Sequence, residues 1–201
     1  MQTKELRTSI AIALVAAASV ALVAAGQFSR RDADQLRLKV DAISRFSEHP
    51  GREPLRTTVT ENEVNAYLTY DAASDLPEGV LEPSITILGP GRVSGRAVVD
   101  LDAVKKHKVS SGPFDPINLL TGRVPITATG VLTTSNGVGR FQLESAAVGG
   151  MPIPKMMLQE LVGYYSRSAQ NPSGINIDDP FALPARIREI QVDHGQAIVV
   201  Q

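Results

Sequence analysis

The most constraining feature of the sequence is an uncharged stretch of twenty residues, Ser9 to Phe28, which reads SIAIALVAAASVALVAAGQF. At about 1.5 Å per helical residue, such a stretch spans the roughly 30 Å hydrocarbon core of a bilayer. It has no polar stripe, which disfavours the alternative of a helix packed into a globular core. We therefore separate residues 9–28 from the folded domain as a transmembrane anchor or signal peptide, preceded by a cytoplasmic N-terminus, residues 1–8.

Two interpretations of this segment remain open. Val23 to Ala25 satisfies the small-residue rule for signal cleavage after Ala25 or Gly26. The full length of the stretch and Phe28 at its end favour an uncleaved anchor instead. Both interpretations predict export of the chain beyond Phe28. We expect a single-pass protein of the inner (cytoplasmic) membrane with its C-terminal domain in the periplasm or at the cell exterior.

Residues 29–54 are predicted to form a juxtamembrane helix and a linker. Leu36, Val40 and Ile43 succeed one another at spacings of three and four, which is typical of one helix face. This helix either packs on the domain or spaces it from the bilayer. The exported domain, residues 55–201, opens with a helix predicted over 59–70, where Thr60 and Glu63 form a capping box.

Beyond Pro77 the apolar period changes from 3.6 to 2, which indicates strands. Gly89-Pro90-Gly91 and Asn136-Gly137 each separate two alternating runs and predict two hairpins. A helix from Ile153 to about Ser168 and two terminal strands complete the chain. This order predicts an α+β fold, in which a curved antiparallel sheet of about six strands wraps around that helix.

Charge and motifs exclude several functions. With 20 basic and 21 acidic residues, the net charge of -1 gives no attraction to nucleic acid. The chain has no cysteine, and His49, His107 and His194 lack a second ligand at metal-binding spacing. No nucleophile elbow, phosphate loop or dinucleotide fingerprint occurs. We predict a protein that is not an enzyme and that has no metal or cofactor.

The composition of the strands raises two alternatives for the interior of the domain, a closely packed core or an apolar groove. Only 4% of the residues are aromatic, although 43% are apolar. Small residues on the strands fill little of the space between two layers, so either the layers approach closely or a groove remains. Methionines adapt to varied apolar partners. The expected sheet face carries Val93, Gly95, Ala97, Val99, Ile126, Ala128, Gly130, Phe141 and Leu143. The candidate groove for an apolar ligand is formed by Met156, Met157, Leu161, Tyr164, Tyr165, Val99 and Phe141.

Several short motifs carry a resemblance. These are VTENEVNAYL at 59–68, LPEGV at 76–80, VGGMPIP at 148–154 and PFALP at 180–184, before a closing Ile-x-x-Ile-x-Val strand. The succession resembles small, membrane-anchored, uncharacterised bacterial envelope proteins, some of which are similar to the tubular lipid-binding (TULIP-like) superfamily. The resemblance covers about residues 55–201 and implies strands wrapped around a helix and lipid as the ligand.

Together these features predict a non-enzymatic, membrane-anchored envelope domain that binds lipid or another apolar ligand. The alternative is a scaffold or assembly module that binds another envelope protein without a small ligand. The expected partners are therefore the membrane, through the N-terminal helix, a lipid or acyl chain, and an envelope protein, with no nucleic acid.

Overall fold

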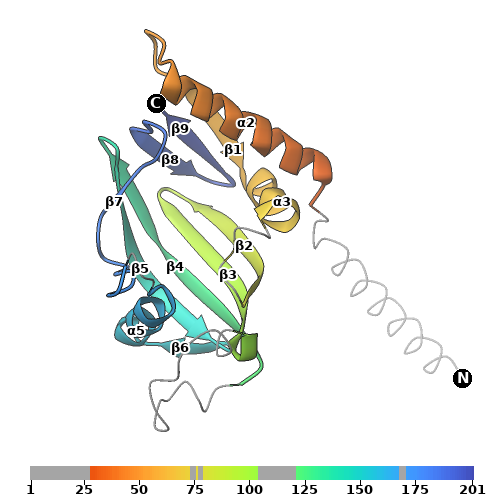
Figure 1. Ribbon diagram of the computed structural model, residues 1–201, viewed down its shortest axis with the longest axis vertical. Coiled ribbons are helices and arrows are strands. Elements are labelled where there is room, and N and C mark those ends of the chain that lie inside the picture. Colours follow the sequence, from red (N-terminus) through yellow and green to blue (C-terminus); the bar gives the residue numbers. More distant parts are fainter. Residues whose placement is uncertain (1–27, 73–75, 77–78, 104–120, 168–170) are drawn as a thin grey trace, which may run out of the picture.

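The computed structural model describes residues 28–72, 76, 79–103, 121–167 and 171–201, and it has an α+β fold with two antiparallel sheets (Figure 1). The larger sheet has six strands: β2 (Val80–Gly89), β3 (Arg92–Asp100), β4 (Arg123–Ser135), β5 (Val138–Val148), β6 (Met151–Ile153) and β7 (Phe181–Ala182). The smaller sheet has the order β1 (Arg56–Thr60), β9 (Gln196–Val200), β8 (Glu189–Asp193). The α+β class and the antiparallel six-stranded sheet are confirmed. The terminal strands differ from the prediction because they pair with β1 in a sheet of their own.

Both predicted hairpins are present. β2 and β3 meet at Gly89-Pro90-Gly91, and β4 and β5 meet at Asn136-Gly137. Asn136 and Gly137 have φ angles of 50° and 79°, the left-handed conformations that a tight hairpin turn requires. The alternating patterns on either side then bring the apolar positions of neighbouring strands onto one face.

The predicted capping box begins helix α3 (Glu61–Tyr70). The Thr60 side chain accepts a hydrogen bond from the Glu63 N–H, and the Glu63 carboxylate accepts one from the Thr60 N–H. The helix starts later than predicted, because Val59 belongs to β1 and pairs with Ala197 of β9. That pairing joins segments far apart in the sequence, which a local pattern does not reveal.

Helix α3 covers the free edge of β2. The Asn65 side chain donates to the Ile85 carbonyl and accepts from the Ile85 N–H, both at 2.7 Å. The Ile87 N–H donates to the Glu61 carboxylate at 2.6 Å. These bonds satisfy backbone groups that an edge strand otherwise presents to a second chain. Glu61 and Glu63 therefore both have structural partners.

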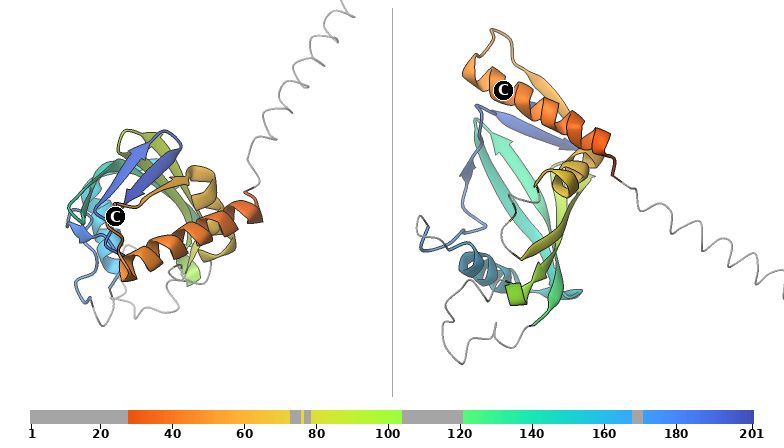
Figure 2. Two further views of the ribbon diagram at one scale, coloured as in Figure 1. Left: turned by 90° about the horizontal axis from the view of Figure 1, so that it is seen from above. Right: turned by 45° about the vertical axis from the view of Figure 1, so that its right-hand side comes forward.

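The two sheets are joined by similar bonds. The Thr134 hydroxyl at the end of β4 bonds both backbone groups of Ile190 in β8, at 2.7 and 3.0 Å. The Gly195 N–H in the β8–β9 turn donates to the Ile87 carbonyl. Viewed from above, β2 and β3, the β8–β9 hairpin and the helices stand around a common centre (Figure 2).

Helix α2 (Arg30–Glu48) packs on the domain, which is one of the two alternatives that the sequence allows. It buries Ala33, Leu36 and Ile43 and contacts α3. On the same face, Lys39 donates to both carboxylate oxygens of Glu63, at 2.6 and 2.7 Å.

This contact predicts an acid-dependent stability. Burial by itself raises the pKa of Glu63, but the hydrogen bonds from Lys39 and Thr60 outweigh it and hold the pKa below its ordinary 4.5. A lowered pKa contributes stability that is present above 4.5 and is lost as the pH falls through the folded-state value. We expect the loss to be about 1.5–3 kcal/mol, the usual contribution of a hydrogen bond to a charged group.

Urea unfolding at a series of pH values measures this effect. The Glu63→Gln variant keeps an acceptor for the Thr60 N–H but has no group that titrates. Its free energy of unfolding should therefore fall less between neutral pH and the acid range than that of the wild type. Equal acid dependence of the two proteins would refute the role given to Glu63.

Helix α5 (Lys155–Tyr165) is placed differently from the prediction. The sheet does not wrap around it, because α5 lies at the end of the six-stranded sheet away from α2 and packs on β5 (Figure 1). Leu158 is its buried apolar contact, whereas Met156 and Met157 are exposed. The helix is fixed instead by Gln159, whose side chain bonds the backbone of Ile175 and Ile177. An apolar arc on a helix does not specify which part of the chain covers it.

In the part of the chain that the structure describes, no helix combines the length and the apolar character needed to cross a bilayer. The predicted anchor or signal peptide, residues 9–28, lies outside the described residues except for Phe28.

Candidate functional site

The candidate site is one face of the six-stranded sheet, which we call the inner face. The strand register places its members opposite one another across β2 to β6. They are Val80, Ile85, Ile87, Val93, Gly95, Ala97, Val99, Val124, Ile126, Ala128, Gly130, Leu132, Phe141, Leu143, Ala146, Val148 and Ile153. None of these residues is polar or charged. The register places the nine predicted residues on one face, and the other eight members, Val80, Ile85 and Leu132 among them, extend it.

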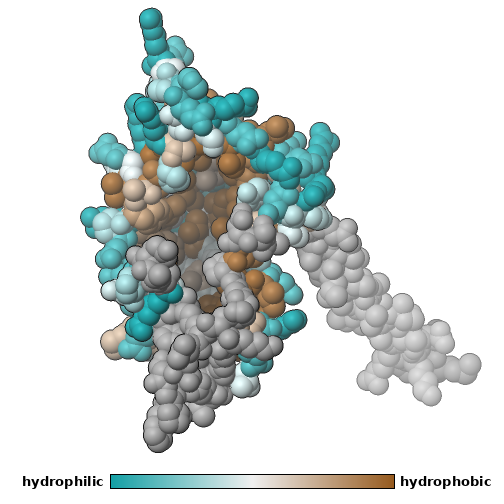
Figure 3. Space-filling model, viewed as in Figure 1, coloured by the Kyte–Doolittle hydropathy of each residue, from teal (hydrophilic) through white to brown (hydrophobic). Residues whose placement is uncertain are grey.

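Most of the inner face is half-buried, although it is apolar throughout. Of its members, only Ile87, Gly130 and Ala146 are buried, and no large side chain in the described residues is fully buried. The side chains of a closed core touch neighbours on all sides. Figure 3 shows the brown, hydrophobic side chains gathered in a recessed part of the surface with hydrophilic rims. The inner face therefore lines a hollow.

Gly95 marks the open part of this hollow. It lies in β3 between Ile85 of β2 and Ala128 of β4, and a Cβ atom added to it would meet nothing within 4 Å. The opposite holds at Gly130 on β4, where an added Cβ would lie 2.6 Å from Cζ of Phe141. The Phe141 ring thus covers Gly130, whereas no side chain of the described residues comes within 4 Å of a Cβ added at Gly95.

The structure brings together some of the predicted groove residues. Val99 and Phe141 both lie on the inner face and are half-buried. Val99 pairs with Val124 and Phe141 with Leu132, so their partners lie eight positions apart along β4. At about 3.3 Å per residue, this is roughly 26 Å along the sheet. They therefore lie toward opposite ends of the face.

The predicted groove residues on α5 are distributed differently. Leu161 is half-buried, whereas the side chains of Met156 and Met157 are 73% and 50% exposed. The side chains of Tyr164 and Tyr165 lie outside the part that the structure describes. The assignment of these helix residues to a ligand groove stays a prediction.

Charged groups stay on the opposite face or at the edges of the sheet. Arg92 forms a paired contact with Glu144 at 2.8 and 2.9 Å on the outer face. Within the described ranges, no group of three or more histidine, aspartate or glutamate side chains is placed to hold a metal ion. The described arrangement can thus offer a long apolar surface to a ligand, with polar groups confined to its surroundings.

No protein-family model matches the chain, and no curated protein matches it. Among solved structures, it is similar to a crystal structure of lipopolysaccharide binding protein, with 14% sequence identity and a TM-score of 0.22. The match covers 73% of this chain and 40% of the other, so the chain spans less than half of that protein's length. A likeness this weak carries no argument about function.

Proposed function

We propose that this protein binds a lipid or another apolar ligand along the inner face of its six-stranded sheet, without catalysing a reaction. The observation that supports this proposal is the open space above Gly95, in the middle of an apolar face that stays half-buried. Apolar surface left without a packing partner is unfavourable by about 25 cal/mol per Å². A bound apolar molecule would remove that surface from water.

The shape of the face favours an extended ligand. The inner face runs roughly 26 Å from Val99 to Phe141 and carries small or aliphatic side chains between them. A linear acyl chain matches such a strip, and each buried methylene contributes about 0.8 kcal/mol. The absence of polar side chains from the face leaves nothing to recognise a compact polar molecule there.

The cellular location of the protein is part of the same proposal. Residues 9–28 would anchor the protein in the inner membrane, and the domain would stand on the exported side. The uncharged twenty-residue stretch supports this arrangement. A domain tethered there would meet membrane lipids at high local concentration.

The proposal is tested on the full chain purified from cell membranes in a mild detergent. Native mass spectrometry is expected to show a population heavier by the mass of one lipid or fatty acid, which extraction with organic solvent removes. A protein that carries no such molecule and also fails to take up a fluorescent fatty acid would refute ligand binding. That result would favour the scaffold alternative, which crosslinking in membranes would then support by trapping a discrete envelope protein.

A further inference from the structure

The edge of β2 is covered unevenly by α3. Over its second half, β2 is hydrogen-bonded to side chains of α3 at Ile85 and Ile87. The first half is irregular, because the register with β3 shifts between Leu81 and Ser84. Glu82 has a φ of 48°, a left-handed conformation that is strained for a residue with a side chain. Pro83 has no N–H to donate, so this stretch is a poor edge for a further strand.

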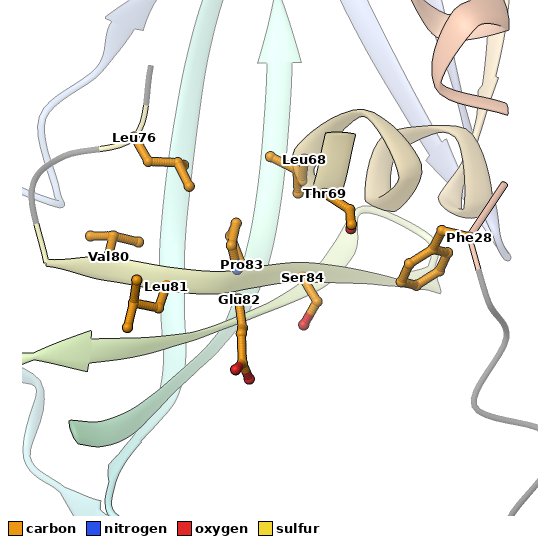
Figure 4. Close-up of a pocket in the computed structure, with 9 residues that line it drawn as sticks. All are labelled: Phe28, Leu68, Thr69, Leu76, Val80, Leu81, Glu82, Pro83 and Ser84. Atoms are coloured by element: carbon orange, nitrogen blue, oxygen red, sulfur yellow. The ribbon is translucent and has the colours of Figure 1, made fainter. Parts of the chain in front are cut away.

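An apolar pocket of about 420 Å³ lies at this irregular stretch, between β2 and α3. Its apolar lining consists of Phe28, Leu68, Leu76, Val80, Leu81 and Pro83. Figure 4 shows Leu68 and Pro83 on facing sides of the gap, whereas Glu82 points away from the helix. Bulges of this kind re-aim side chains and end regular pairing, often beside functional sites.

The pocket and the inner face share one residue, Val80. Val80 lines the pocket and also pairs with Val99, a member of the inner face near one end of it. An apolar chain that entered between Leu68 and Pro83 would therefore reach the inner face past Val80, although Thr69, Glu82 and Ser84 also line the pocket.

The pocket also lies where the chain continues toward its uncharged N-terminal stretch. Phe28 is the last residue of that stretch and lines the pocket. Its carbonyl accepts a hydrogen bond from the Tyr70 hydroxyl at 2.9 Å. Arg30 donates to the Asp71 carboxylate at 3.0 Å and lies over the Tyr70 ring. The end of α3 thus holds the start of the described chain beside the pocket.

We propose that the pocket between β2 and α3 is a side entrance through which one acyl chain of a membrane lipid passes from the bilayer to the inner face. This inference rests on the proposed function, and it adds the route. A membrane lipid is the proposed occupant because Phe28, which lines the pocket, ends the uncharged twenty-residue stretch. If that stretch spans the bilayer, it would place this opening next to the membrane, and not the α5 end of the sheet.

The test separates the rate of uptake from the amount bound. The full chain and its variants are loaded at equilibrium with a pyrene-labelled phosphatidylglycerol by dialysis from detergent, and bound probe is counted. In parallel, uptake is followed from phosphatidylcholine vesicles that contain the same probe, as the loss of pyrene excimer emission. Thr69→Trp places a ring at the exposed rim of the pocket. Leu88→Trp is the control, since Leu88 is exposed at the other end of β2.

We expect Thr69→Trp to lower the rate of probe uptake by at least about tenfold, because the lipid would have to wait for the ring to move aside. The amount of probe bound at equilibrium should stay within about twofold of the wild type. Leu88→Trp should match the wild type in both measurements. Unchanged uptake by a folded Thr69→Trp protein would overturn the entrance while leaving the proposed function standing. A loss of equilibrium loading in Thr69→Trp would also overturn it, since the pocket would then be the binding site itself. A wild type that binds no probe in either assay would overturn both proposals.

A photoreactive benzoylphenylalanine at position 69 identifies the occupant directly. Crosslinking to the labelled lipid in vesicles would support the entrance. Crosslinking to the protein's own residues before Phe28 would overturn it, because the pocket would then be filled by the chain itself.

Discussion

Replacing Gly95 with tryptophan should reduce the binding of a fluorescent fatty acid by at least about tenfold, because the indole would occupy the hollow that the ligand needs. The backbone of β3 should tolerate the change. An added Cβ at Gly95 meets nothing within 4 Å, and a side chain in a strand interior is more favourable than glycine there. The variant should therefore remain folded while it loses its ligand.

A matched control is available on the neighbouring strand. Thr86 is exposed, and its register partner is Ser94, so it lies on the outer face of the same sheet. Thr86→Trp should bind the fatty acid as the wild type does. The chain has no natural tryptophan, so each variant reports from a single indole, and the emission of Gly95→Trp should lie at shorter wavelength than that of Thr86→Trp.

The same pair of variants shows how the proposal would fail. If Gly95→Trp is folded by circular dichroism and binds the fatty acid with wild-type affinity, the ligand does not lie on the inner face. Gly95→Leu provides a second, smaller obstruction in case the indole prevents folding. We expect it to weaken binding less than tryptophan does and in the same direction.

The features that sequence reasoning predicts correctly are those set by neighbours in the chain. The Thr60–Glu63 capping box and the Asn136-Gly137 turn depend on residues within three positions of each other. The inner face results from period-two alternation once the turns define the register. The small residues raise the alternatives of close layers or a remaining gap, and an added Cβ at Gly95 meets nothing within 4 Å, which favours the gap.

The features that sequence reasoning misses depend on pairings across long stretches of chain. β1 pairs with β9 across about two thirds of the sequence, so the local pattern places Val59 in a helix that starts two residues later. The wide apolar arc of α5 suggests a wrapped helix, yet Met156 is 73% exposed. Hydrophobic periodicity shows which side of a helix is apolar, and the chain topology decides what covers that side.

The role of Asn65 also escapes sequence reasoning, and it carries the largest expected effect on stability. Asn65 is 2% exposed, and its amide satisfies both the N–H and the carbonyl of Ile85. Asn65→Ala removes both partners and leaves two backbone groups unpaired at a covered edge. Each such group costs about 1–3 kcal/mol, so we expect a loss of about 2–6 kcal/mol. At roughly 2–4 °C per kcal/mol for a domain of this size, the melting temperature should fall by about 5–25 °C.

Asn62 is the matched control for this substitution, because it is the same residue type on the same helix but is exposed to solvent. Asn62→Ala should change the free energy of unfolding by no more than about 0.5 kcal/mol, as is usual for surface positions. Asn65→Asp separates the two bonds of the amide: it can still accept from the Ile85 N–H, but an ionised carboxylate cannot donate to the Ile85 carbonyl. Its melting temperature should also fall below that of the wild type. If Asn65→Ala has the same melting temperature as Asn62→Ala, then the Asn65 bonds do not hold α3 on the edge of β2. The distinction between the part of that edge bonded to α3 and the irregular part beside the pocket would then lose its basis.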